Sequence, residues 1–210
     1  VPDIPVHSAS TDPAVAAAKT QLSAMQPKSW LPLNHLLQSI ATVWPDAVVV
    51  GASTQPVYAG NHLFEPARIR SWFNSSTGYG TLGYGLPAAI GAKLAVPERP
   101  GVCLVGDGGL QFTLPELASA VEAGTPVIVV LWNNQGYGEI KSYMQKHQIA
   151  TIGVDLYTPD FQQLAQGFGC AATLVRHREE LLPALQQADS ERPTVIEIQA
   201  ETFGLACRKT

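Results

Sequence analysis

Two polar motifs in the sequence carry residues that could bind a metal ion and an anion together. The first is Gly-Asp-Gly-Gly at 106–109 and the second is Asn-Asn-Gln-Gly at 133–136, and each directly follows an apolar run. Asp107 offers a charged oxygen and Asn134 a neutral one, which are ligand types that a hard cation such as magnesium or calcium prefers. Such a pair leaves coordination positions for backbone carbonyls, water and phosphate oxygens.

Glycines around the aspartate indicate an anion site in the same loop. Gly106, Gly108 and Gly109 lack a Cβ atom, so their backbone N–H groups can come close to phosphate oxygens. A metal ion and these amides could therefore share one phosphorylated ligand. Taken alone, each motif is more simply explained as a tight turn or a loop, and only the pair favours a site.

The elements that would position these motifs alternate along the chain. Helix signals occur over 13–25 and 33–43, at a cap with a following glutamate at 113–116, and at 158–160, where a helix begins that Gly169 ends. Continuous apolar runs, typical of strands covered on both faces, lie at 47–50, 102–105, 127–131, 172–175 and 195–198.

This alternation predicts an α/β fold with a doubly wound, mainly parallel sheet and helices on both faces. In such a sheet, ligands bind at the carboxyl ends of the strands, which is where both polar motifs fall.

The two motifs together resemble the signature of thiamine-diphosphate enzymes, which begins with Gly-Asp-Gly and closes with Asn-Asn. Asn134 follows Asp107 by 27 residues, which is similar to the spacing in that signature. The glycine-rich segment 78–92 is similar to the one that holds the aminopyrimidine ring in pyruvate decarboxylase, acetolactate synthase and benzoylformate decarboxylase. The resemblance covers residues 30–199. It implies the diphosphate-binding domain of an enzyme that acts on 2-oxo acids, with thiamine diphosphate and Mg²⁺ as cofactors.

The resemblance also implies roles for individual residues. The side chains of Asp107 and Asn134 and the backbone carbonyl of Gly136 would bind the metal ion. The backbone of the first motif would bind the diphosphate through Gly106, Gly108 and Gly109.

In the glycine-rich segment, the resemblance implies that the Gly80 carbonyl accepts a hydrogen bond from the cofactor's amino group. The Leu82 side chain would lie as a wedge between the two cofactor rings, with Thr81 contacting the cofactor beside it. Ser53 and Thr54 match in position hydroxyl residues that contact the diphosphate in some decarboxylases. A helix cap or a simple turn explains these two residues equally well.

The activating glutamate of these enzymes lies on a separate pyrimidine-binding domain, usually of another subunit, and no candidate for it is recognisable here. The resemblance therefore implies no catalytic residue in this chain, a chain that is inactive alone, and a homodimer or homotetramer. We expect 1–29 to be a linker or the end of a middle domain, 30–200 the cofactor-binding domain and 201–210 a tail. The chain would be a C-terminal fragment or the small subunit of a two-chain decarboxylase.

The residues after the second motif bear on the substrate. Acetolactate synthases tend to carry a Trp-Gln or Trp-Glu element and an aromatic pair there, whereas this chain has Gly-Glu-Ile-Lys-Ser-Tyr-Met at 138–144. A carboxylate at Glu139 would favour a cationic 2-oxo acid, although a solvent-exposed glutamate in a first helical turn is the simpler explanation. A non-catalytic cofactor-binding or dimerisation module is the alternative function.

Composition excludes several other classes. A net charge of −4 without basic runs argues against binding to nucleic acid. No run approaches 18 apolar residues and no signal-peptide pattern is present, so we expect no membrane span. Three widely spaced cysteines without a C-x-x-C pair favour a reduced, cytoplasmic compartment, with Cys103 as core filling.

Overall fold

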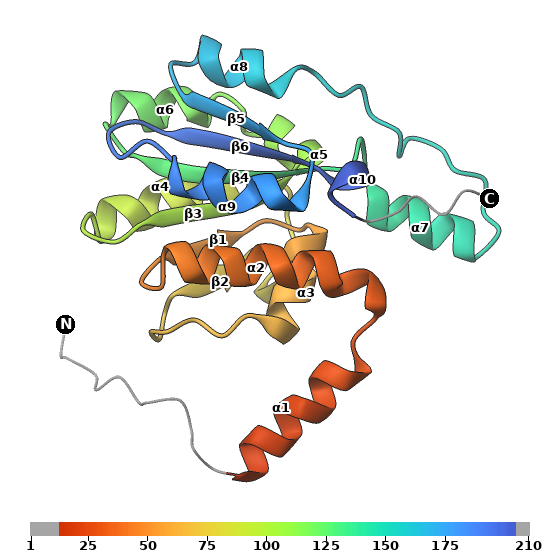
Figure 1. The fold of residues 1–210 in the computed structure, drawn as a ribbon. Coiled ribbons are helices and arrows are strands. Elements are labelled where there is room, and N and C mark those ends of the chain that lie inside the picture. The colour runs from red at the N-terminus through yellow and green to blue at the C-terminus, as the bar shows by residue number, and fades with distance from the viewer. Residues whose placement is uncertain (1–12, 205–210) are drawn as a thin grey trace.

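The structure is a computed structural model that describes residues 13–204, and a single parallel sheet forms its centre (Figure 1). The order across the sheet is β2-β1-β3-β4-β6-β5, and every pairing between neighbours is parallel. The strands are β1 (Val48–Gly51), β2 (Trp72–Asn74), β3 (Gly101–Gly106), β4 (Val127–Asn133), β5 (Ala171–Val175) and β6 (Thr194–Gln199). The predicted doubly wound α/β fold is confirmed.

Successive strand residues enter two separate cores, because side chains alternate between the faces of a sheet. One face is covered by α2 (Leu31–Val43), α3 (Gln55–Leu63), α9 (Arg178–Gln186) and α10 (Ala200–Phe203). The other face is covered by α4 (Gly85–Ala95), α5 (Asp107–Gln111), α6 (Glu116–Glu122) and α8 (Phe161–Gly167). Both faces of the strands are thus buried, which is why their sequences are continuously apolar.

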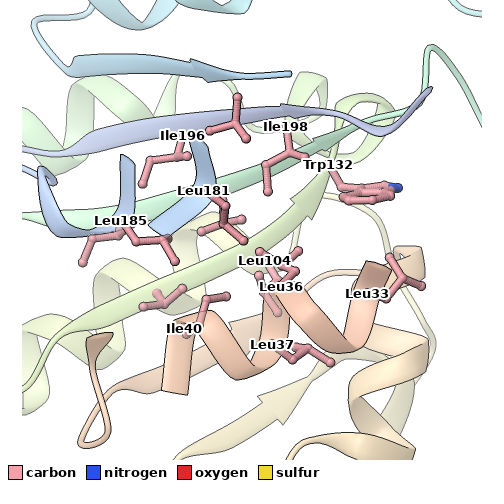
Figure 2. Packing of buried hydrophobic residues seen from close by; sticks show 14 of the residues in the cluster. Leu33, Leu36, Leu37, Ile40, Leu104, Trp132, Leu181, Leu185, Ile196 and Ile198 are labelled. Atoms are coloured by element: carbon pink, nitrogen blue, oxygen red, sulfur yellow. The ribbon is translucent and has the colours of Figure 1, made fainter. Parts of the chain in front are cut away.

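The first of these cores is shown in Figure 2. Leu36 and Ile40 of α2 lie beside Leu104 of β3, and Leu185 of α9 packs into the same cluster. Each of these side chains is fully buried, which contributes about 1.5–3 kcal/mol per residue. Burial on this scale fixes how α2 and α9 sit on the sheet, and so fixes the strand ends that carry the polar motifs.

The core extends beyond the expected boundary at residue 200. Phe203 of α10 is fully buried and meets Trp132 edge-on, with the ring centroids 5.9 Å apart. Residues 205–210 of the expected tail lie outside the described residues, as do residues 1–12 of the expected linker. The helix-like run in that linker forms α1 (Pro13–Met25), which lies away from the sheet (Figure 1).

The other elements predicted from the sequence were found, except for the helix cap at Thr113. The five apolar runs form β1 and β3 to β6, the 33–43 pattern forms α2, and Asp160 caps α8 by accepting a hydrogen bond from the Gln163 amide at 2.9 Å. Strand β2 was not predicted, because it has only three residues. The cap predicted at Thr113 is wrong, because the Thr113 hydroxyl donates to the Gly83 carbonyl at 3.2 Å and α6 begins at Glu116.

Helix α7 (Gly138–Lys146), unlike the helices that cover the sheet, buries none of its residues, and it extends beyond the ends of the strands (Figure 1). Two short 3-10 helices, Lys28–Trp30 and Ser75–Thr77, complete the described elements. Over residues 13–204, no helix combines the length and the apolar character that crossing a membrane requires.

Candidate functional site

The chain changes direction across the sheet between β1 and β3. It passes from β1 outward to β2 and then back across β1 to β3, so the loops that follow β1 and β3 separate at their carboxyl ends. Ligands of open α/β sheets bind at such a point. A cleft of about 220 Å³ lies there. Its lining includes these predicted site residues: Ser53, Thr54, Gly80, Leu82, Gly106, Asp107, Gly108, Gly109, Asn134 and Gly136.

Asp107 is the buried charged group of this cleft, and few hydrogen bonds compensate its burial. Asp107 is the first residue of α5, directly after β3, and it is only 1% exposed. Oδ1 accepts a long hydrogen bond, 3.4 Å, from the Asn134 backbone amide, whereas Oδ2 is buried with no hydrogen-bond partner. Desolvation raises the pKa of the carboxyl above its ordinary value. A cation at Oδ2 would supply the missing compensation.

The Asn134 carboxamide lies between Asp107 and the Gly136 carbonyl. One of its terminal atoms is 3.1 Å from Asp107 Oδ1 and 2.8 Å from Gly136 O. If that atom is nitrogen, it donates two hydrogen bonds; if it is oxygen, three oxygens face one another, and a cation is needed to hold them. With the amide oxygen in this place, the carboxylate, amide and carbonyl oxygens fit a hard divalent ion. Within residues 13–204 no cluster of three or more His, Cys, Asp or Glu side chains could bind a metal, so phosphate and water would complete this site.

A buried carboxylate on β6, which the sequence analysis missed, supports the loop that carries Asn134. Glu197 accepts hydrogen bonds from Asn133 Nδ2 at 2.7 Å and from Gln162 Nε2 at 2.9 Å. Asn133 Oδ1 in turn accepts from the Gln135 amide at 3.1 Å. This turn has left-handed backbone at Gln135, with φ of 62°, so the network holds a conformation that costs energy for a residue with a side chain. The sequence feature that could have revealed Glu197 is its charge, because the rest of the run 195–198 is apolar.

Close packing explains two glycines of the first motif, Gly108 and Gly106. A Cβ atom on Gly108 would lie 2.7 Å from the Tyr137 ring and 3.0 Å from Leu156. A Cβ atom on Gly106 would lie 3.1 Å from the Thr54 hydroxyl. Because these glycines have no Cβ atom, the loops after β1, β3 and β4 can meet closely enough to line one cleft.

The glycine-rich segment joins the cleft through Ser53. The Ser53 hydroxyl donates to the Gly80 carbonyl at 2.8 Å and lies 3.1 Å from the Ser75 hydroxyl. Thr54 occupies the position before α3 but makes no side-chain cap hydrogen bond, so capping does not explain it. Leu82 is half-buried and lines the cleft, whereas Thr81 is exposed and is absent from the lining.

A second cavity, of about 360 Å³, shares part of its wall with the cleft. Gln55, Tyr58 and Glu139 line both. The second cavity is also lined by Ser29, Trp30, Leu33 and Ser142. Sequence analysis singled out Glu139 but not its partners, because they come from distant segments that only the fold brings together.

The thiols of Cys103 and Cys170 do not contribute to the chemistry. Both residues are buried, and burial raises the pKa of each thiol above its ordinary value, which disfavours the reactive thiolate. The prediction that Cys103 fills the core is confirmed. Cys207 lies outside the described residues.

Comparison with known proteins identifies the class to which this fold and cleft belong. Residues 52–198 match the family described as thiamine pyrophosphate enzyme, C-terminal TPP binding domain. The chain belongs to this family, as the two polar motifs predicted.

Several enzymes of known description are similar to the chain. The probable 2-ketoarginine decarboxylase of Pseudomonas aeruginosa is 45% identical over 177 residues, covering 81% of this chain and 32% of that protein. The acetolactate synthase large subunit of Corynebacterium glutamicum is 33% identical over 183 residues, covering 82% of this chain and 29% of that protein. A solved 4-hydroxybenzoylformate decarboxylase of Rhodococcus jostii RHA1, which is thiamine-diphosphate-dependent, aligns with a TM-score of 0.73 at 31% identity, covering 83% and 33%. The chain thus spans about a third of the length of these relatives.

Proposed function

We propose that this chain binds the diphosphate of thiamine diphosphate through Mg²⁺, and that the enzyme to which it belongs decarboxylates a 2-oxo acid. The observation that carries the proposal is the convergence of Asp107, the Asn134 carboxamide and the Gly136 carbonyl beside a buried carboxylate oxygen without a partner. Carboxylate, amide and carbonyl oxygens are a ligand set for Mg²⁺, which commonly bridges a protein and phosphate groups.

The residues around this metal site would bind and orient the rest of the cofactor. When bound, thiamine diphosphate supplies the electron sink that stabilises the carbanion left by decarboxylation. The backbone of Gly106, Gly108 and Gly109 would face the diphosphate. Gly80, fixed by the Ser53 hydroxyl, would hold the pyrimidine through its carbonyl, which has a second lone pair free to accept. Leu82, which lines the cleft, would act by its volume in keeping the cofactor bent.

A partner domain would complete the active site. The only glutamate among the described residues of the cleft lining is Glu139, which accepts a hydrogen bond from Gln55 and is not one of the predicted cofactor ligands. The surface beside the cleft exposes Tyr79 fully and Phe112 to 61%. Large exposed aromatic side chains next to a functional cleft support docking of another domain. We propose that a pyrimidine-binding domain of the same enzyme, from another subunit of a homodimer or homotetramer, covers this surface and supplies the activating glutamate.

The relatives support the substrate class. Two of the enzymes that are similar to the chain act on 2-ketoarginine and on 4-hydroxybenzoylformate, according to their descriptions. These compounds share a 2-oxo carboxylate and differ in the side chain, so both relatives support a 2-oxo acid as the substrate class. Carboligation of the acetolactate synthase type is the second candidate, favoured by the 33% identical relative.

The test is release of carbon dioxide from a panel of 2-oxo acids with Mg²⁺ and thiamine diphosphate saturating. The chain alone should be folded and inactive, and adding a pyrimidine-binding domain should give turnover that is lost in Asp107→Ala. Detection of acetolactate from pyruvate would favour the second candidate. Equal turnover with and without the added domain would refute the claim that half of the active site lies elsewhere.

A further inference from the structure

The second cavity lies where a substrate bound beside the cofactor could extend its side chain. It shares Gln55, Tyr58 and Glu139 with the proposed cofactor cleft, so the two spaces have a common wall. The remaining wall comes from the 3-10 helix Lys28–Trp30, from the start of α2 and from α7, none of which carries a predicted cofactor ligand. A compound held by its 2-oxo carboxylate in the cleft would meet this cavity with its other end.

The charge of the shared wall selects for a cation. Neither cavity has Lys, Arg or His among the described residues of its lining, and Glu139 contributes a carboxylate to both. The other acid of the cleft, Asp107, is committed to the proposed metal site. Ser29 and Ser142 add hydroxyl acceptors to the second cavity. A cationic tail would give the exposed Glu139 carboxylate a counter-charge, which a neutral or anionic tail would not.

Glu139 is exposed, but a chain of hydrogen bonds sets the position of its side chain. Gln55 Nε2 donates to Glu139 Oε1 at 2.7 Å, across 84 residues of sequence. Gln55 Oε1 in turn accepts from the fully buried Trp132 indole at 2.9 Å. One carboxylate oxygen, Oε1, is therefore held by Gln55.

Aromatic side chains line the same space. Trp30 and Tyr58 are both half-buried and contribute to the wall of the second cavity. A guanidinium group is planar and weakly hydrated, so it stacks on aromatic faces while its N–H groups reach a carboxylate. An ammonium group would use the carboxylate but gain less from the flat walls.

We propose that Glu139, held by Gln55, and the rings of Trp30 and Tyr58 form a specificity pocket for a 2-oxo acid with a guanidinium-bearing side chain. This inference rests on the proposed function, because it assigns the substrate class of that same site. Loss of the carboxylate should remove a charge-assisted hydrogen bond. Such bonds correspond to about a 10- to 100-fold change in an equilibrium or rate ratio.

The experiment compares two substrates of matched shape, 5-guanidino-2-oxopentanoate and the neutral 2-oxo-5-ureidopentanoate, by kcat/KM for carbon dioxide release in the holoenzyme. The wild type should prefer the guanidino acid by a factor of about 10 or more, and Glu139→Gln should lower this preference about 10- to 100-fold. Glu122→Gln, an exposed glutamate of α6 that lines neither cavity, is the matched control and should keep the preference.

A binding measurement separates recognition from chemistry. Calorimetric titration with 5-guanidinopentanoate, which lacks the 2-oxo group, should detect binding to the wild type and lose it in Glu139→Gln. Unchanged preference in Glu139→Gln, or a wild type that turns over the ureido acid equally well, would overturn the pocket while leaving the proposed function intact. Failure to release carbon dioxide from any 2-oxo acid would overturn the proposed function and this inference with it.

Discussion

Replacing Asp107 with asparagine should stabilise the domain when no metal is present. The wild-type carboxylate is 1% exposed and its Oδ2 has no hydrogen-bond partner, so its charge is carried at a cost. An unsatisfied buried polar group costs about 1–3 kcal/mol, and a charged one more. Asparagine removes the charge at nearly constant volume, so we expect the free energy of unfolding to rise by about 1–3 kcal/mol at neutral pH.

The pH dependence of this difference has a definite sign. Burial raises the pKa of Asp107 in the folded chain above its ordinary value of 3.8. A group whose pKa is raised on folding contributes stability that is complete below the unfolded pKa and is lost as pH rises through the folded pKa. The advantage of Asp107→Asn should therefore be present at neutral pH and disappear below pH 3.8.

With Mg²⁺ and thiamine diphosphate bound, the wild type should become more stable than Asp107→Asn. A bound molecule at 100 times its Kd stabilises the folded state by about 2.7 kcal/mol. Only the wild type retains the Asp107 carboxylate that would bind the metal. The assay is urea unfolding followed by tryptophan fluorescence, with and without Mg²⁺ and thiamine diphosphate. Asp46→Asn, an exposed aspartate in a 3.4 Å ion pair with Arg68, is the control and should change little.

Two results would refute the reasoning about Asp107. One is an Asp107→Asn domain that is less stable than the wild type at neutral pH without metal. The other is a variant that gains as much stability as the wild type from Mg²⁺ and thiamine diphosphate. Either would mean that the carboxylate is compensated within the fold and is not a metal ligand.

Two further predictions concern the residues around the metal site. Leu82→Met should keep turnover in the holoenzyme, whereas Leu82→Ala should lose kcat more than cofactor affinity, because the side chain acts by volume. Steady-state kinetics with a cofactor titration checks this. Full activity of the alanine variant would contradict it. Glu197→Gln should weaken Mg²⁺ binding about 10-fold, because supporting groups of metal ligands commonly contribute that much. A Mg²⁺ titration checks this against Glu201→Gln, and identical curves would show that Glu197 serves folding alone.

Much of the fold could be predicted because the sheet is buried on both faces. The runs that form β3 and β4 are continuously apolar, and the run that forms β6 is interrupted only by Glu197, so their strand character is visible without the structure. Strand β2 escaped detection because three residues at the edge of a sheet carry too little pattern. The cap at Thr113 was wrong because its hydroxyl finds a tertiary partner, the Gly83 carbonyl, 30 residues away in sequence.

The site was predictable only in the parts that local motifs encode. Asp107 and Asn134 stand in short motifs at strand ends, and the parallel sheet brings such ends together. The supports for these motifs could not be found in the same way. Glu197 reaches Asn133 across 64 residues, and Gln55 reaches Glu139 across 84, so both contacts depend on the completed strand order.

The central claim is that Asp107, Asn134 and Gly136 bind the metal that holds the cofactor diphosphate. The most direct measurement is a crystal structure of the holoenzyme with thiamine diphosphate and Mn²⁺ in place of Mg²⁺, using anomalous scattering to locate the ion. We predict one peak bonded to the Asp107 carboxylate, the Asn134 amide oxygen and the Gly136 carbonyl, at about the 2.0–2.2 Å expected of a six-coordinate hard cation. A peak elsewhere, or an Asn134 nitrogen still hydrogen-bonded to Asp107 with cofactor bound, would contradict the account.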